Sequence, residues 1–124
     1  MRLAFLELGR RDAPYPPEIT ALRGRSGVYV IRARSTRRVV YVGESHTGAL
    51  YRTLTRHFQV WTRAKRWWEQ AYGRQHDPGV VYARGAVEVA AIPLAAARAV
   101  AAQRALIARL KPRDNINETE DVPF

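Results

Sequence analysis

The sequence predicts a small α/β domain of the α+β kind, in which a three-stranded, antiparallel-type sheet is flanked by helices. Two runs rich in β-branched and aromatic residues, 27–31 and 39–43, are separated by a short polar stretch, which is the pattern of a hairpin. Residues 86–92 alternate weakly and predict a third strand. The alanine-rich run 94–110 predicts a long helix. With 124 residues and 47% apolar composition, the chain has room for one domain, 1–124.

The parts outside these elements are punctuated by proline, glycine and charge. Residues 1–24 predict an irregular lead-in with at most a helical turn, because the segment APYPPEI places prolines where regular structure needs backbone N–H groups. The glycine-bounded segment 73–85 predicts a loop. Pro112 should end the long helix, and the acidic stretch 116–124 predicts a partly disordered tail.

A stripe of apolar residues at helical spacing follows Gly48. It predicts a helix over 49–71, either continuous or broken, with basic side chains on its more exposed side. The stripe consists of Leu50, Leu54, Phe58 and Trp61.

The charge balance favours a polyanionic partner. The chain has 21 Lys and Arg residues against 11 Asp and Glu, a formal net charge of +10, and nearly all of the basic residues are arginine, whose planar fork suits phosphate. The alternative is that arginine reflects only the composition of the proteome.

The absence of cysteine excludes disulfides and thiolate zinc sites. No secretory signal or membrane-length apolar stretch is present, so we expect a cytoplasmic protein without a membrane partner.

Four short motifs occur at consistent spacing between residues 26 and 115. They are GVY at 27–29, YVG at 41–43, LxxxLxxHF at 50–58 and LIxxxKPxxN at 106–115. Together they resemble the GIY-YIG nuclease family. The resemblance implies that family's fold and an endonuclease that hydrolyses DNA, with RNA as the alternative substrate, using Mg²⁺ or Mn²⁺.

Two tyrosines and a histidine are the candidate catalytic residues. In adjacent antiparallel strands Tyr29 and Tyr41 can emerge as neighbours on one face, although isolated strand tyrosines more often only pack. The resemblance implies that they position or deprotonate the attacking water. His57 matches the family position for a proton-transfer residue, and its ordinary pKa suits that task; the alternative is a histidine at the edge of the core. Gly43 would let nucleic acid approach the backbone closely.

Two positions depart from the family pattern. Thr53 stands where an arginine usually clamps the phosphate, and Arg52 or Arg56 is expected to replace it, with Arg52 favoured. Gln103 stands where the family carries the metal-binding Glu. Its helical phase predicts that it faces the core side, toward the same surface as Tyr29 and Tyr41. An amide is a poor substitute for a carboxylate toward Mg²⁺, so metal affinity and cleavage are expected to be reduced or lost. A ligand could come instead from Glu88 or Glu44, although a solvated strand or loop charge is the commoner role.

A basic, aromatic stretch after the first helix and two isolated residues complete the candidates. Arg63, Lys65 and Arg66 are expected to contact DNA phosphates beside tryptophans that stack on bases; the tryptophans could equally be core or dimer contacts. Asn115 is expected to support the nucleic-acid site or simply to form a turn, and His46 lies in the loop after YVG. The competing functions are a non-cleaving nucleic-acid-binding module on the same fold and, more remotely, a protein-interaction domain.

Overall fold

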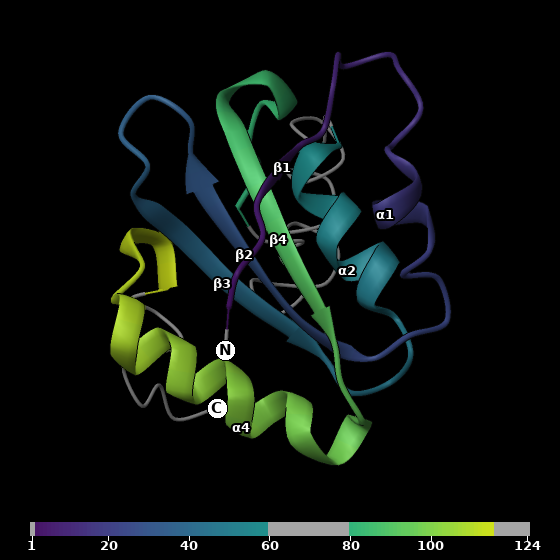
Figure 1. Ribbon diagram of the computed structural model, residues 1–124, viewed down its shortest axis with the longest axis vertical. Coiled ribbons are helices and arrows are strands. Elements are labelled where there is room, and N and C mark those ends of the chain that lie inside the picture. Colours follow the sequence, from purple (N-terminus) through teal and green to yellow (C-terminus); the bar gives the residue numbers. More distant parts are fainter. Residues whose placement is uncertain (1, 60–79, 116–124) are drawn as a thin grey trace, which may run out of the picture.

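The computed structural model describes residues 2–59 and 80–115, and these form an α+β fold around one antiparallel sheet (Figure 1). The strands are β1 (Leu6–Glu7), β2 (Gly27–Ala33), β3 (Val39–Ser45) and β4 (Val87–Pro93), in the order β1-β4-β2-β3. The helices are α1 (Pro17–Thr20), α2 (Leu50–Thr55) and α4 (Ala96–Leu110), joined by 3-10 turns at Arg56–Phe58, Arg84–Ala86 and Arg113–Asn115. No helix among the described residues is long and apolar enough to cross a bilayer.

The predicted hairpin is the centre of the sheet. β2 pairs with β3 on one side and with β4 on the other, so that Tyr29 lies opposite Gly43 and Ala91. An irregularity after Ile31 leaves Val40 unpaired in the register, and Arg37 takes a left-handed conformation (φ 59°) in the connecting turn. β3 pairs with β2 alone and is therefore an edge strand of the sheet.

Because successive strand residues point to opposite faces, the sheet separates two apolar clusters. The first contains Tyr29 and Tyr41 and is covered by Leu50 and Leu54 of α2. The second contains Val28, Val30 and Val42 and is covered by Leu106 of α4. Figure 1 shows the two helices on either side of the sheet. The two tyrosines therefore point to the face of the sheet opposite to the one that α4 covers.

The predicted α+β class is confirmed, but the sheet has four strands instead of three. The extra strand, β1, comes from the lead-in 1–24, which also contains α1 and so is only partly irregular. Leu6 pairs with Val89 and covers part of the β4 edge, which would otherwise leave backbone groups unpaired. The buried guanidinium of Arg84 fixes the segment that follows, by donating to the carbonyl oxygens of Leu8, Arg11 and Ala13.

The helix predicted over 49–71 is shorter in its described part. It begins at Leu50, ends at Thr55 and tightens into a 3-10 turn through Phe58, after which Gln59 is extended (φ −87°, ψ 144°). Residues 60–79 and the tail 116–124 lie outside the described residues. The third strand and the alanine-rich helix agree with the prediction to within about two residues at each end.

Gly43 is required by the packing of Tyr29. The Tyr29 ring lies directly across the Gly43 backbone of the neighbouring strand, and a Cβ at position 43 would overlap the Cζ, Cε1 and hydroxyl oxygen of that ring. Gly43 thus lets a large aromatic ring lie flat on the edge strand. Its space is filled by the protein's own side chain, which leaves no room for the close approach of nucleic acid expected from the sequence.

We predict that Gly43→Ala destabilises the fold by about 1–3 kcal/mol, because the added methyl group must displace a fully buried ring. Urea unfolding would measure the change. Gly85→Ala is the matched control, since a Cβ there meets nothing within 4 Å and the glycine has no positive φ. Equal stability of the two variants would contradict this account of Gly43.

Candidate functional site

Tyr29 and His57 form a buried hydrogen-bonded pair between the sheet and the turn after α2. The Tyr29 hydroxyl lies 2.7 Å from His57 Nε2, and His57 Nδ1 lies 2.6 Å from the carbonyl oxygen of Val80. A carbonyl can only accept, so Nδ1 must carry the ring hydrogen. In the neutral ring Nε2 is then an acceptor, and Tyr29 donates to it. Val80 therefore sets the tautomer that makes His57 a base toward Tyr29.

Tyr41 completes the cluster, as the sequence predicts. Its ring is stacked on that of Tyr29 with centroids 6.1 Å apart, and its centroid lies 4.6 Å from that of His57. Tyr29 and His57 are each 1% exposed, whereas Tyr41 is 9% exposed and is the member of the cluster closest to solvent. Hairpin pairing and the packing of the first helix predict that Tyr29, Tyr41 and His57 converge on one concave surface. The three side chains do converge, but Tyr29 and His57 are buried and do not form a surface.

The surroundings of His57 keep its imidazole neutral at physiological pH. Burial disfavours the charged ring and lowers its pKa below the usual 6.5; the bond to Val80 opposes this effect, and the positive charge of Arg56 adds to it. A neutral imidazole whose Nε2 is an acceptor can receive a proton from the hydroxyl that donates to it. The electrostatics and the tautomer thus agree on the role of base.

Arg56, rather than the favoured Arg52, is the cation beside this cluster. Arg56 begins the 3-10 turn that carries His57 and is half-buried, and its Nε has no hydrogen-bond partner among the described residues. Arg52 is exposed and lies next to Arg23 and Thr47 near the start of α2. Arg52 lies two residues from both Leu50 and Leu54, the buried leucines of α2, so helical spacing places it on the opposite, exposed side of the helix.

The side chain of Asn115 pairs with the open edge of β3. Its Oδ1 accepts from the Val42 N–H at 2.8 Å, and its Nδ2 donates to the Val42 carbonyl oxygen at 2.9 Å. Both groups of this edge residue are thereby satisfied by one amide, as a neighbouring strand would satisfy them. Asn115 is fully buried. Asn115 also lies in the 3-10 turn Arg113–Asn115, so the structure combines the turn and the supporting position expected from the sequence, and its assignment to DNA binding stays a prediction.

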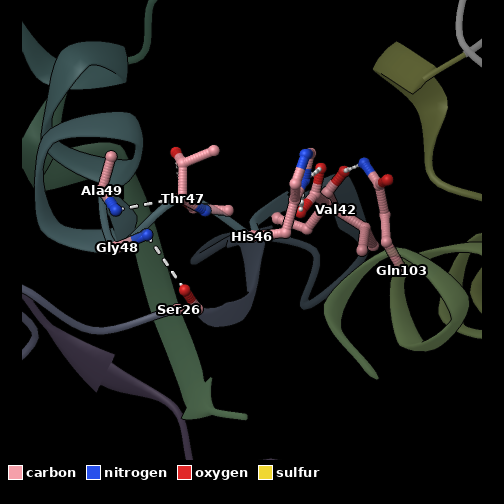
Figure 2. Close-up of polar contacts among 9 residues, drawn as sticks. Ser26, Val42, His46, Thr47, Gly48, Ala49 and Gln103 are labelled. Atoms are coloured by element: carbon pink, nitrogen blue, oxygen red, sulfur yellow. Dashed lines mark hydrogen bonds and ion pairs between the residues drawn. The ribbon is translucent and has the colours of Figure 1, made fainter. Parts of the chain in front are cut away.

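Gln103, on α4, also forms a hydrogen bond with Val42 at the edge of β3. Its Nε2 donates to the Val42 carbonyl oxygen at 3.3 Å, and Figure 2 shows its side chain directed at Val42. The expectation that it points to the tyrosine surface is wrong, because α4 packs on the face of Val42 while the neighbouring Tyr41 points the other way. The helical phase correctly predicts that Gln103 faces the sheet, but not which face.

The loop between β3 and α2 is fastened by two serines. Ser26 accepts from the N–H of Gly48 and Ser45 accepts from the N–H of Ala49, each at 3.0 Å (Figure 2). These bonds fix the start of α2 and, through it, the position of His57. The exposed His46 is in this loop, and its Nδ1 lies 3.1 Å from a Glu44 carboxylate oxygen.

The described residues do not fit a resident Mg²⁺ or Mn²⁺. Gln103 presents an amide N–H to a carbonyl, and Glu44 is engaged by His46. Glu88 forms a 2.8 Å ion pair with Arg32 and lies 3.9 Å from Arg37, so arginines already balance its charge. Among the described residues no group of three or more His, Asp or Glu side chains could hold a metal ion. Mg²⁺ and Mn²⁺ require several clustered oxygen donors, which the described residues do not provide.

Sequence reasoning missed the strand-like segment that holds His57. Tyr82 donates its N–H to the His57 carbonyl oxygen at 2.7 Å and its hydroxyl to Asp114 Oδ2 at 2.6 Å. Burial and the acceptor Asp114 raise the pKa of the Tyr82 phenol well above its usual value of 10. The run VVY at 80–82, within a predicted loop, is a weak sequence signal for this segment. The hydrogen bond from His57 to the Val80 carbonyl could not be predicted, because any residue type provides a backbone carbonyl.

The remaining candidates, Arg63, Lys65 and Arg66 with the neighbouring tryptophans, lie outside the described residues. A scan against protein-family models and a search of curated proteins find no match for this chain.

We predict that His57 makes the protein less stable below pH 6.5. The pKa of His57 in the folded protein is below the unfolded value of 6.5, so the unfolded chain binds the proton more tightly. The contribution of His57 to the free energy of unfolding is therefore fully present above pH 6.5. It decreases as the pH falls toward the folded pKa. Urea unfolding between pH 7.5 and 5, compared with His57→Gln, would measure this effect. The loss on acidification should be smaller in the variant, and parallel profiles would contradict the prediction.

Proposed function

We propose that this chain acts on DNA as a domain of the GIY-YIG nuclease type and hydrolyses phosphodiester bonds. The observation that carries the proposal is the arrangement Tyr29–His57–Val80, in which a neutral imidazole accepts from a phenol and is oriented by a backbone carbonyl. A buried tyrosine hydroxyl needs some hydrogen-bond acceptor, and here that acceptor is a group that can take up its proton. A buried base aligned with a phenol beside a second tyrosine suits the activation of water.

These residues supply a path for one proton. A water beside Tyr41 attacks the phosphorus and passes its proton to the Tyr29 hydroxyl as the hydroxyl's own proton moves to His57 Nε2. The bond from phosphorus to the leaving oxygen breaks, and that oxygen takes a proton from solvent. Arg56, whose Nε has no hydrogen-bond partner among the described residues, is a cation close enough to act on His57 and can offset the developing charge.

A DNA substrate is supported by charge. The net charge of +10 favours a polyanion, and phosphate contacts would make its binding strongly dependent on salt. The same chemistry would attract RNA, so DNA is chosen on the motif resemblance and RNA is an alternative for the test.

The second candidate is a nucleic-acid-binding module that does not cut. It is favoured by Gln103, whose amide donates to Val42 where a metal-binding carboxylate would be required. A carboxylate at this position would face a carbonyl oxygen with no hydrogen to donate, so the amide suits the present structure and the metal site is absent from the described residues.

We predict that this chain nicks DNA slowly and that Tyr29→Phe lowers the rate by about 10²–10⁴-fold, the usual contribution of acid–base catalysis. The assay uses duplex, branched and single-stranded DNA and single-stranded RNA, with EDTA, Mg²⁺ or Mn²⁺, and DNA affinity is measured in parallel. Tyr15→Phe is the matched control, because this tyrosine packs edge-on against Tyr51 and has no ring contact with His57 among the described residues.

The carboxylate question is tested in the same assay. Gln103→Glu should add metal-dependent cleavage if only the ligand is missing, whereas Glu44→Gln and Glu88→Gln should leave cleavage unchanged. If no protein cuts any substrate while all bind DNA, the nuclease proposal fails and the binding module stands. If none binds nucleic acid, both fail.

A further inference from the structure

A basic cavity lies outside the catalytic cluster, between the β2–β3 turn and the end of α4. Its volume is about 620 Å³. Figure 1 shows the turn and the last residues of α4 on the same side of the molecule. Three cationic and three apolar side chains account for most of its lining: Arg38, Lys111, Arg113, Val39, Val40 and Leu110.

Among the described residues, two of the three cations that line this cavity have no acidic partner. The cavity has no carboxylate in its lining, and neither Arg38 nor Lys111 forms an ion pair within residues 2–59 and 80–115. The third cation, Arg113, is held in a fixed direction by a two-bond contact with Asp114, at 2.8 and 3.0 Å. Two cations without a carboxylate partner among the described residues, beside an apolar floor, suit a ligand that has both a phosphate and a sugar.

The other cavity at this end of the hairpin has the opposite character. Its two arginines, Arg34 and Arg37, face two carboxylates: Arg34 lies 2.9 Å from Glu7, and Arg37 lies 3.9 Å from Glu88. The consecutive residues Arg37 and Arg38 thus line different cavities, one with balanced charge and one without. The positive charge of the basic cavity is therefore a local feature and not a general property of this arginine-rich turn.

Two connections lead from the basic cavity to the catalytic cluster. Val40 lines the cavity and is followed directly by Tyr41, the cluster member closest to solvent. In addition, Arg113 is held by Asp114, which accepts from Tyr82, and the Tyr82 ring centroid lies 6.0 Å from that of His57. A nucleic-acid strand in the cavity would therefore lie beside the β3 edge near Tyr41.

We propose that the basic cavity binds the sugar–phosphate backbone of the DNA strand whose neighbouring phosphodiester reaches Tyr41. The inference rests on the proposed action on DNA and adds the surface that holds the strand. Arg38 and Lys111 contact phosphates, Arg113 supplies a third contact from a fixed direction, and the apolar floor packs against a sugar. The contacts are to the backbone, so they position the strand without reading its sequence.

The test compares two double variants that each remove two positive charges. Arg38→Gln with Lys111→Gln neutralises the basic cavity, and Arg34→Gln with Arg37→Gln neutralises the balanced one. The pairs are matched, because each contains one residue with a left-handed backbone, Lys111 (φ 48°) or Arg37 (φ 59°). Thermal unfolding of each variant is the control that checks whether the fold is retained.

The readout is the affinity for a short duplex and for a single strand as a function of salt. We expect the basic-cavity variant to lose at least about tenfold in affinity near 100 mM salt and to lower the salt slope by about 2, one for each phosphate contact, while the control changes the slope by less than about 0.5. Equal weakening by both variants would overturn the inference and leave the proposed function standing. A wild-type chain that binds no DNA would overturn both.

Discussion

The position of the candidate site depends on the contact between the Tyr29 ring and the backbone of Gly43. Because residue 43 has no side chain, the ring crosses the edge strand β3 and its hydroxyl reaches His57. With a larger residue there, the ring would have to leave the sheet, and the 2.7 Å bond could not form. The stacking of Tyr41 on the same ring then depends on this one close approach.

The edge strand also connects the tyrosine–histidine cluster to the amide side chains of Asn115 and Gln103. On one face β3 presents Tyr41 to His57, which favours proton transfer. At its open edge the Val42 carbonyl accepts from both Asn115 and Gln103, and Gln103 stands at the position where a metal-binding carboxylate was expected. A phenol–imidazole pair suited to proton transfer is present, but a neutral amide stands where a metal-binding carboxylate was expected. For this reason cleavage and simple binding are competing proposals.

Much of this arrangement could be predicted from local patterns, and the rest depends on contacts between distant segments. The hairpin, the third strand and the long helix follow from periodicity, and pairing across the hairpin brings Tyr29 and Tyr41 together. The two-residue strand β1 is too short to leave a pattern. The layer that Gln103 enters depends on which side of the sheet α4 crosses, and the Val80 carbonyl that orients His57 carries no side-chain signal. The balance of Glu88 by two arginines likewise requires the register of β2 and β4.

Nitrogen NMR of the His57 ring tests the central claim, that a backbone carbonyl holds His57 as a neutral base toward Tyr29, most directly. At pH 7.5 the account predicts a protonated Nδ1 and an unprotonated Nε2 whose chemical shift shows an accepted hydrogen bond. In Tyr29→Phe the Nε2 shift should move toward that of a free acceptor nitrogen while Nδ1 stays protonated. A ring protonated at Nε2, or an Nε2 shift that is unchanged in Tyr29→Phe, would contradict the account.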